Sequence, residues 1–198
     1  MRGRTRWTWI VVVVATMLAL PAGALAQDPP PASPSPQPQP SASGGAQYGA
    51  PDWQPTVPGD VAQVVDGIAY APQDAPLAVQ QAIWAANQIV GLPYRFGGGH
   101  RLDFTDTGYD CSGTVSYALH GASLVKTPLD SSDFMRWGLR GKGQWITVYT
   151  NPGHAYMTIA GIRLDTSSAG DPSGLKGPRW RPLARVSRGF RARHPLGL

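Results

Sequence analysis

The segment from residue 27 to residue 59 most limits what this chain can fold into. It consists almost entirely of Pro, Ser, Gln, Ala and Gly and contains the run Pro29-Pro30-Pro31. A segment of this composition cannot bury enough apolar surface to offset the entropy lost on ordering it. We therefore predict an extended, semi-rigid linker over 27–59. Residues 60–198 remain for one folded domain, and they are ample for a single hydrophobic core.

The first 26 residues have the three parts of an export signal. Three arginines lie within the first six residues, an uncharged and mostly apolar run follows over 7–20, and Ala24-Leu25-Ala26 closes the segment. Small residues at the two alanine positions suit signal peptidase, so we predict a signal peptide over 1–26 and a secreted or cell-wall-associated protein. The uncharged run through Ala26 is also just long enough to span a bilayer. An uncleaved membrane anchor is therefore the alternative, and only in that case is a membrane a partner.

Charge separates an acidic body from a basic tail. The chain has a formal net charge of +5 and 12 acidic residues, all of them Asp and all ahead of Ser173. Seven cations follow Ser173, and we call residues 175–198 the basic tail. An exported protein meets the anionic polymers of a cell wall before it meets nucleic acid, so we expect no nucleic-acid partner. The basic tail is either a solvated surface or a surface attracted to anionic wall polymers.

Two helices are predicted in the first half of the folded part. Apolar residues recur with helical spacing after Asp74, a candidate N-cap, and Gly91 is expected to end this helix. Its apolar face consists of Val79, Ile83, Ala86 and Val90. A second helix is predicted to begin at Cys111, with Asp110 as its N-cap and Gly121 just past its end.

Short strand-like runs follow the helices. Turn signals separate three of these runs, at 144–149, 154–160 and 162–166. The turns fall at 151–153 and at Ala160-Gly161. Helices followed by strands with hairpin-sized gaps predict an α+β fold, with N-terminal helices packed on an antiparallel sheet.

The single cysteine, Cys111, is the first candidate for chemistry. With one cysteine the chain forms no internal disulfide, and a lone thiol is unusual in an exported protein. In the first turn of a helix capped by Asp110, unpaired backbone N–H groups would stabilise a thiolate. A buried structural cysteine is the alternative interpretation.

His154 is the candidate base for this thiol. A cysteine nucleophile needs a group that takes its proton and later gives it to the leaving amine. His154 opens a predicted strand directly after a Pro-Gly turn, whereas His120 falls at a helix C-terminus, where a cation is stabilised for structural reasons. His194 lies in the basic tail, and His100, in a loop after three glycines, is the main rival.

Strand geometry selects Asp165 as the residue that orients His154. If Ala160-Gly161 forms a two-residue hairpin, His154 lies opposite Ser167, and Asp165 is its diagonal neighbour on the same face. Ser167 shares that face and is the alternative. A solvated aspartate at a strand end is the third interpretation.

Taken together, these segments resemble the NlpC/P60 cysteine peptidases over residues 75–168. The resemblance rests on four elements, which are Gly91-Leu92-Pro93-Tyr94-Arg95-Phe96-Gly97-Gly98, Asp110-Cys111-Ser112-Gly113, Gly153-His154 and a polar residue further along the chain. It implies a compact, papain-like α+β fold. It also implies hydrolysis of amide bonds in the peptide stems of bacterial cell walls.

The resemblance gives each site residue an implied role. Cys111 would be the nucleophile, His154 the base and Asp165 the third polar residue. Residues expected at the substrate and oxyanion site are Tyr94, Asp110 and Ser112. The third polar position is most often His in this family, and here it is Asp. A carboxylate should hold and charge the imidazole at least as well, so we expect activity to survive.

The sequence therefore predicts an exported cysteine amidohydrolase whose partners are peptidoglycan stem peptides. No cofactor or metal is expected. The glycines at 97–99 lack the Lys-Ser/Thr of a phosphate loop, residues 103–114 lack the final Glu of a calcium loop, and no Cys/His spacing supports zinc. Two alternatives remain, a non-catalytic wall-binding protein on the same fold and an acyltransferase that uses the same Cys/His site.

Overall fold

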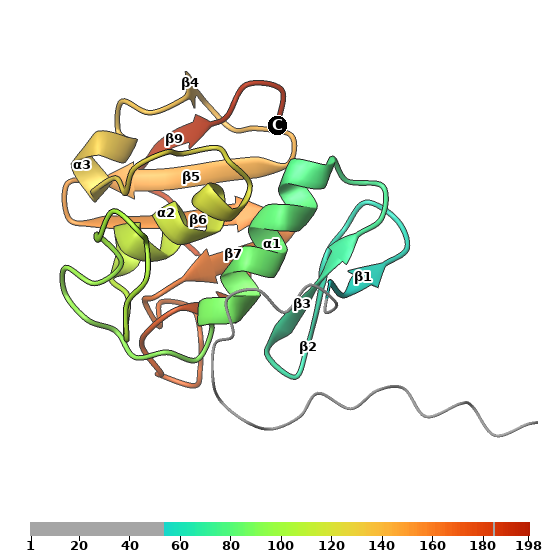
Figure 1. Ribbon diagram of the computed structural model, residues 1–198, viewed down its shortest axis with the longest axis horizontal. Helices are drawn as coiled ribbons and strands as arrows, with labels where there is room; N and C mark the ends of the chain where they lie inside the picture. The colour runs from blue at the N-terminus through green and yellow to red at the C-terminus, as the bar shows by residue number, and fades with distance from the viewer. Residues whose placement is uncertain (1–53, 184) are drawn as a thin grey trace, which may run out of the picture. The chain divides into compact units, whose positions relative to one another are not determined.

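The computed structural model describes residues 54–183 and 185–198 (Figure 1). The chain divides into two units, Met1–Ser43 and Gly44–Leu198, and all described residues belong to the second. The predicted signal peptide over 1–26, and the predicted linker as far as residue 53, lie outside the described residues. Within the described part of the chain, no helix is both long and apolar enough to cross a membrane.

A six-stranded sheet forms the centre of the described unit. Its strand order is β4-β9-β5-β6-β7-β8, and every neighbouring pair is antiparallel. The strands are β4 (Leu139–Arg140), β5 (Ile146–Asn151), β6 (His154–Ile159), β7 (Ile162–Asp165), β8 (Arg179–Arg181) and β9 (Arg191–His194). Pairing of Ile159 with Ile162 leaves Ala160-Gly161 as a two-residue hairpin loop. Both loop residues have positive φ, 44° and 84°, as a type I′ turn requires, and the predicted hairpin is confirmed.

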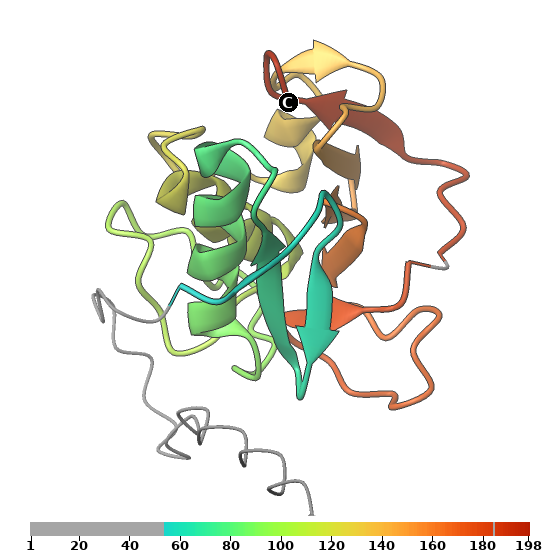
Figure 2. The same ribbon diagram turned by 90° about the vertical axis from the view of Figure 1, so that its right-hand side faces the viewer.

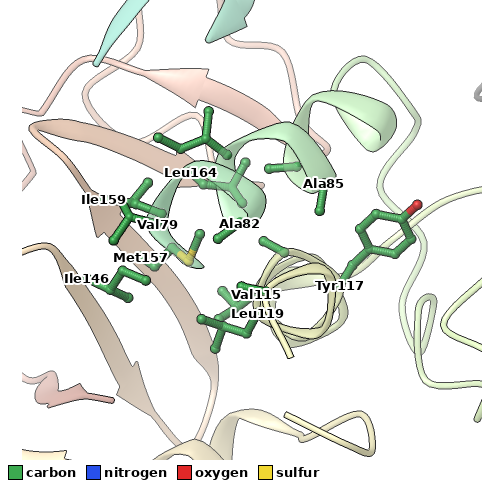
Figure 3. Packing of buried hydrophobic residues seen from close by; sticks show 14 of the residues in the cluster. Val79, Ala82, Ala85, Val115, Tyr117, Leu119, Ile146, Met157, Ile159 and Leu164 are labelled. Carbon is green, nitrogen blue, oxygen red and sulfur yellow. The ribbon is translucent and has the colours of Figure 1, made fainter. Parts of the chain in front are cut away.

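Three helices pack on this sheet: α1 (Leu77–Ile89), α2 (Cys111–Gly121) and the single-turn α3 (Ser131–Phe134). In Figure 1, α1 and α2 lie in front of β5, β6 and β7. Figure 3 shows the resulting core, in which α1 and α2 meet the sheet through buried apolar side chains that include Val79, Val115, Leu119, Met157 and Leu164. The predicted class, α+β with helices packed on an antiparallel sheet, is therefore confirmed.

The predicted helices form with two corrections at their ends, one of which is that Gly121, expected just past α2, is the last residue of that helix and Ala122 is the C-cap. α2 begins at Cys111, and the Asp110 carboxylate accepts a hydrogen bond from the Gly113 N–H at 2.8 Å, as expected of an N-cap. At α1, however, the N-cap is Pro76, with no side-chain capping bond, and not Asp74. The reason is local, because the Asp74 N–H donates to the Gly59 carbonyl at 3.1 Å and so belongs to the turn ahead of the helix.

A small second sheet was not predicted from the sequence. It consists of β1 (Thr56–Val57), β2 (Gln63–Val65) and β3 (Ile68–Pro72) in the order β1-β3-β2, and α1 packs on β3. The Pro55 carbonyl accepts hydrogen bonds from the Ala71 N–H at 2.9 Å and from the Trp84 indole at 3.0 Å. The ordered fold therefore begins before residue 60, and the predicted linker boundary at 59 is too late.

The basic tail is also part of the fold rather than an appendage. It supplies β8 and β9, and the Leu198 carbonyl accepts hydrogen bonds from the backbone N–H groups of Trp145 and of Ile146, the first residue of β5. Arg181 and Arg193 are buried. A uniformly solvated basic surface is therefore the wrong description of residues 175–198, although cations such as Arg188 remain exposed.

Candidate active site

Cys111 lies at the first position of α2, buried and unpaired with any other cysteine. The His154 side chain and the backbone N–H of Ala155 both stabilise the charged form of its thiol. Burial would raise the pKa of this thiol, but these two interactions outweigh burial and hold the pKa below its ordinary value. The sulfur is therefore placed to be a thiolate more readily than a free cysteine.

His154 is the first residue of β6 and lies between Cys111 and Asp165. Its Nε2 is 2.9 Å from Asp165 Oδ1, which leaves the other ring nitrogen for the sulfur. Burial would lower the pKa of His154, but the hydrogen bond to Asp165 and the interaction with Cys111 outweigh it and raise the pKa to about 9. The protonated form of the imidazole is therefore favoured at neutral pH.

Asp165 ends β7, and its side chain is fully buried. Side chains alternate along strands, so the observed hairpin register places His154 and Asp165 on one face, as the parity argument predicted. The Ser167 N–H donates to the same Oδ1 at 2.9 Å, while the Ser167 hydroxyl accepts from the Ala169 N–H. Of the two candidates, Asp165 contacts His154, and Ser167 supports Asp165 through its backbone.

Tyr94 lies in the loop ahead of α2, where it forms an isolated parallel bridge with Tyr109. Its side chain is 39% exposed, so it borders solvent. Burial raises the pKa of Tyr94, and the negative charge of Cys111 adds to the effect, which places this hydroxyl in the electrostatic range of the sulfur. Tyr94 is therefore partly exposed and electrostatically coupled to Cys111, and its role at a substrate site stays a prediction.

Asp110 and Ser112, the other two residues expected at the substrate site, direct their side chains into the helix start. The Asp110 carboxylate accepts from the Gly97 N–H at 3.0 Å and lies 3.0 Å from His100 Nε2. The Ser112 hydroxyl donates to the same carboxylate at 3.2 Å. Both residues are buried, so these side chains brace α2 rather than facing a substrate.

The rival histidines have structural contacts. His100 pairs with Asp110, and that hydrogen bond raises the pKa of His100 despite partial burial. His120 stacks on Phe104 with ring centroids 3.9 Å apart, and His194 Nδ1 lies 3.1 Å from the Gly141 carbonyl. Among the residues that the structure describes, no group of three or more His, Cys, Asp or Glu side chains is arranged to hold a metal ion.

Three residues at the site were missed by sequence reasoning. Arg185 and Phe190 belong to the basic tail, and nothing in their local pattern links them to His154. Tyr156 was detectable in principle, because two residues beyond His154 on a strand is the same face. The Tyr156 and Phe190 rings pack against the His154 ring, with centroids 6.3 and 6.2 Å away.

Comparison with known proteins gives a limited picture. No protein-family model matches the chain, and no curated protein matches it. Among solved structures, the chain is similar to the peptidoglycan hydrolase RipB from Mycobacterium tuberculosis, with 21% identity and a TM-score of 0.44 over 60% of this chain and 64% of that chain. The chain thus spans less than two thirds of that hydrolase, and its function has to be inferred from its own site.

Proposed function

We propose that the protein is an exported cysteine amidohydrolase that cleaves amide bonds in peptidoglycan stem peptides. One observation carries the proposal: His154 is hydrogen-bonded to Asp165 Oδ1 at 2.9 Å and interacts with the Cys111 thiol, and the two interactions raise the pKa of its imidazole. A nucleophile, a base and a residue that orients the base, in that contact order, form the arrangement that acyl transfer requires.

In the first half of the reaction, the Cys111 thiolate attacks the carbonyl carbon of the amide. The His154 imidazolium then donates its proton to the departing amine, the C–N bond breaks, and a thioester to Cys111 remains. In the second half, neutral His154 takes a proton from water as the water oxygen attacks the thioester. The thiolate leaves, the carboxylic acid product is released, and His154 is protonated again.

The oxyanion of each tetrahedral intermediate forms beside the start of α2. Backbone N–H groups in the first turn of a helix have no intrahelical acceptor, and they are suited to stabilise negative charge. The partial exposure of Tyr94 and its electrostatic coupling to Cys111 support a role as an added hydroxyl donor for the oxyanion or the substrate.

Two features support peptide stems of the cell wall as the substrate class. The first is the set of motifs around Tyr94, Cys111 and His154, which resembles the NlpC/P60 peptidases. The second is the export signal predicted over 1–26, which would deliver the protein to the cell wall. Asp165 departs from the usual third residue of that family, and its direct contact with His154 supports the same role here.

The proposal is tested with purified protein and solubilised peptidoglycan fragments, with products identified by mass. Release of new amino and carboxyl termini is expected from the wild type and is expected to vanish in Cys111→Ala and His154→Ala. His194→Ala is the matched histidine control, because the His194 ring nitrogen lies 3.1 Å from the Gly141 carbonyl and not at Cys111, and this variant should stay active. Equal release by wild type and Cys111→Ala would refute the proposal.

The same assay separates the two alternatives. Retention on insoluble walls without product release, unchanged in Cys111→Ala, would indicate a wall-binding protein. A product whose mass rises by that of an added amine, less water, would indicate an acyltransferase that uses the same thioester.

A further inference from the structure

Between β8 and β9, the described residues 182–183 and 185–190 lie on the face of the sheet that the helices leave open. β8 lies at one edge of the sheet and β9 beyond β5, so the chain has to pass over β7, β6 and β5. Figure 2 shows this connection in red, on the side of the sheet away from α1. Met157 and Leu164 face the helical core, and alternation along the strands therefore turns Tyr156 and Asp165 toward this connection. We call residues 185–190 the strap.

We infer that Arg185 of the strap is a positioning residue for the reaction, one that holds the Asp165 carboxylate against His154 and shares its negative charge. The inference rests on the proposed function of Cys111 and His154. It adds a residue that the motif resemblance does not include and that no local pattern in the sequence identifies.

The contacts of Asp165 carry the inference. An Arg185 guanidinium N–H donates to Asp165 Oδ2 at 2.7 Å, while Oδ1 lies 2.9 Å from His154 Nε2. The carboxylate is thus held at both oxygens, one by the base and one by the strap. A charge-assisted bond between buried partners is short and directional, so it fixes the rotation of the carboxylate.

Two aromatic rings fix the guanidinium in turn. The Arg185 guanidinium carbon lies 4.7 Å from the centroid of Tyr156 and 5.4 Å from that of Phe190. Phe190 also meets the Tyr156 ring edge-on at 5.2 Å. Cations over aromatic faces are attracted by the ring quadrupole. The Arg185 side chain is only 12% exposed, so solvent screens its pairing with Asp165 weakly.

Other charged groups near Asp165 do not hold its carboxylate in this orientation. Arg163 Nε lies 3.8 Å from Oδ2, and Arg163 instead donates to the Ala169 carbonyl. Arg181 donates to the backbone carbonyl of Asp165 and pairs with Asp171. Titratable or charged groups that face the His154–Asp165 pair from the packed elements are Cys111, Tyr156, Arg163, Arg179, Arg181 and Arg185. Apart from His154, Arg185 is the only described residue whose side chain donates a hydrogen bond to this carboxylate.

The chemistry explains why a shared carboxylate is needed. A buried aspartate with no second partner would hold the proton of the imidazolium strongly, and His154 could not return to the neutral form that activates water. A cation on the far oxygen reduces that pull. Arg185 therefore weakens the hold of Asp165 on the imidazolium proton, a hold that an uncharged third residue would not exert.

The test is the pH dependence of Cys111 alkylation by iodoacetamide in the full chain, because it reports the Cys111–His154 pair without a substrate. In Arg185→Gln the upper inflection, where His154 loses its proton, is expected to rise by about one pH unit. Arg185→Lys, which keeps the charge, should restore the wild-type inflection. Arg188→Gln removes an exposed cation from the same strap and should leave it unchanged.

An unchanged upper inflection in Arg185→Gln would overturn the inference, and so would an equal rise in Arg188→Gln, which would indicate a general charge effect. If Arg185→Gln fails to fold, Arg185→Met removes the same charge while keeping an apolar stem against Tyr156 and Phe190. Failure of the proposed function would appear separately. In that case the wild-type protein would release no peptidoglycan fragments, while the pH profile of Cys111 alkylation would still change in Arg185→Gln.

Discussion

At the scale of single residues, Cys111 and His154 shift each other's pKa. The pKa of Cys111 is lowered and that of His154 is raised, and each shift has the other residue among its causes. Between the two pKa values the pair exists as thiolate and imidazolium. In the proposed reaction, that state supplies both the nucleophile and the acid for the leaving group.

Hydrolysis should therefore show a bell-shaped dependence of kcat/KM on pH. Below the pKa of Cys111 the nucleophile is lost, and above the pKa of His154, about 9, no proton remains for the leaving amine. The acid limb is expected below the usual range of a thiol and the alkaline limb near pH 9. An alkaline limb at about pH 6.5, the value of an unperturbed imidazole, would contradict the pairing of His154 with Asp165 and Cys111.

Replacing the orienting carboxylate should reduce turnover far more than it reduces substrate affinity. Asp165→Ala leaves His154 Nε2 without its partner, and we expect kcat to fall by roughly 10²–10⁴-fold. The matched control is Ser167→Ala, which keeps the backbone N–H that contacts Asp165 and should stay within about threefold of the wild type. Steady-state kinetics on a defined stem peptide measure both variants. A larger loss of kcat in Ser167→Ala than in Asp165→Ala would indicate that Ser167, and not Asp165, orients His154.

At the scale of elements, the start of α2 depends on a close approach between helix and loop. A Cβ at Gly113 would collide with the Gly98 carbonyl oxygen, so the loop at 97–99 packs directly on the first helical turn. That loop also supplies the Gly97 N–H bound to Asp110. The position of the Cys111 sulfur therefore depends on Gly113 and Gly98, which have no side chain and so allow the close approach.

Gly113→Ala should accordingly lower both stability and activity. Overpacking is expected to cost about 1–3 kcal/mol in the free energy of unfolding, and displacement of Cys111 should reduce hydrolysis roughly 10²-fold. Gly121→Ala is the matched control at the other end of α2, where a Cβ would collide with Ala85. Denaturant unfolding should show similar losses for both variants, but only Gly113→Ala should be slow in hydrolysis. Full activity of folded Gly113→Ala would exclude this role of the close approach.

At the scale of the whole folded unit, the C-terminal strands complete both the sheet and the site. β8 and β9 pair with β7 and β5, the buried Trp180 indole donates to Asn87 of α1 at 2.8 Å, and the strap between them reaches His154. Removing these strands would expose the edges of two central strands.

Deletion of residues 175–198 is therefore expected to abolish the cooperative thermal transition. The control replaces three exposed cations of the same region, Lys176, Arg188 and Arg191, by Gln, and should melt within a few degrees of the wild type. A truncated chain with a wild-type melting curve would show that the tail is dispensable. The charge variant, rather than the deletion, is the appropriate protein for testing attraction to anionic wall polymers.

Local patterns in the sequence were enough to predict the elements that carry Cys111, His154 and Asp165. A cap one residue before the cysteine, a Pro-Gly turn before the histidine and an even hairpin loop before the aspartate each act within about a dozen residues. Such signals depend on helical or strand periodicity, which is present in the local sequence regardless of contacts with distant segments.

Only the tertiary structure decided which of these residues contact one another and which further residues contact them. β1, β8 and β9 have two to four residues each, too few for an alternating pattern, so their pairing depends on neighbours far away in the sequence. Arg185 and Phe190 read as part of a basic tail until the chain crosses the sheet and brings them to Asp165 and His154. Periodicity is a local property of the chain, whereas contact between distant strands arises only when the core is packed.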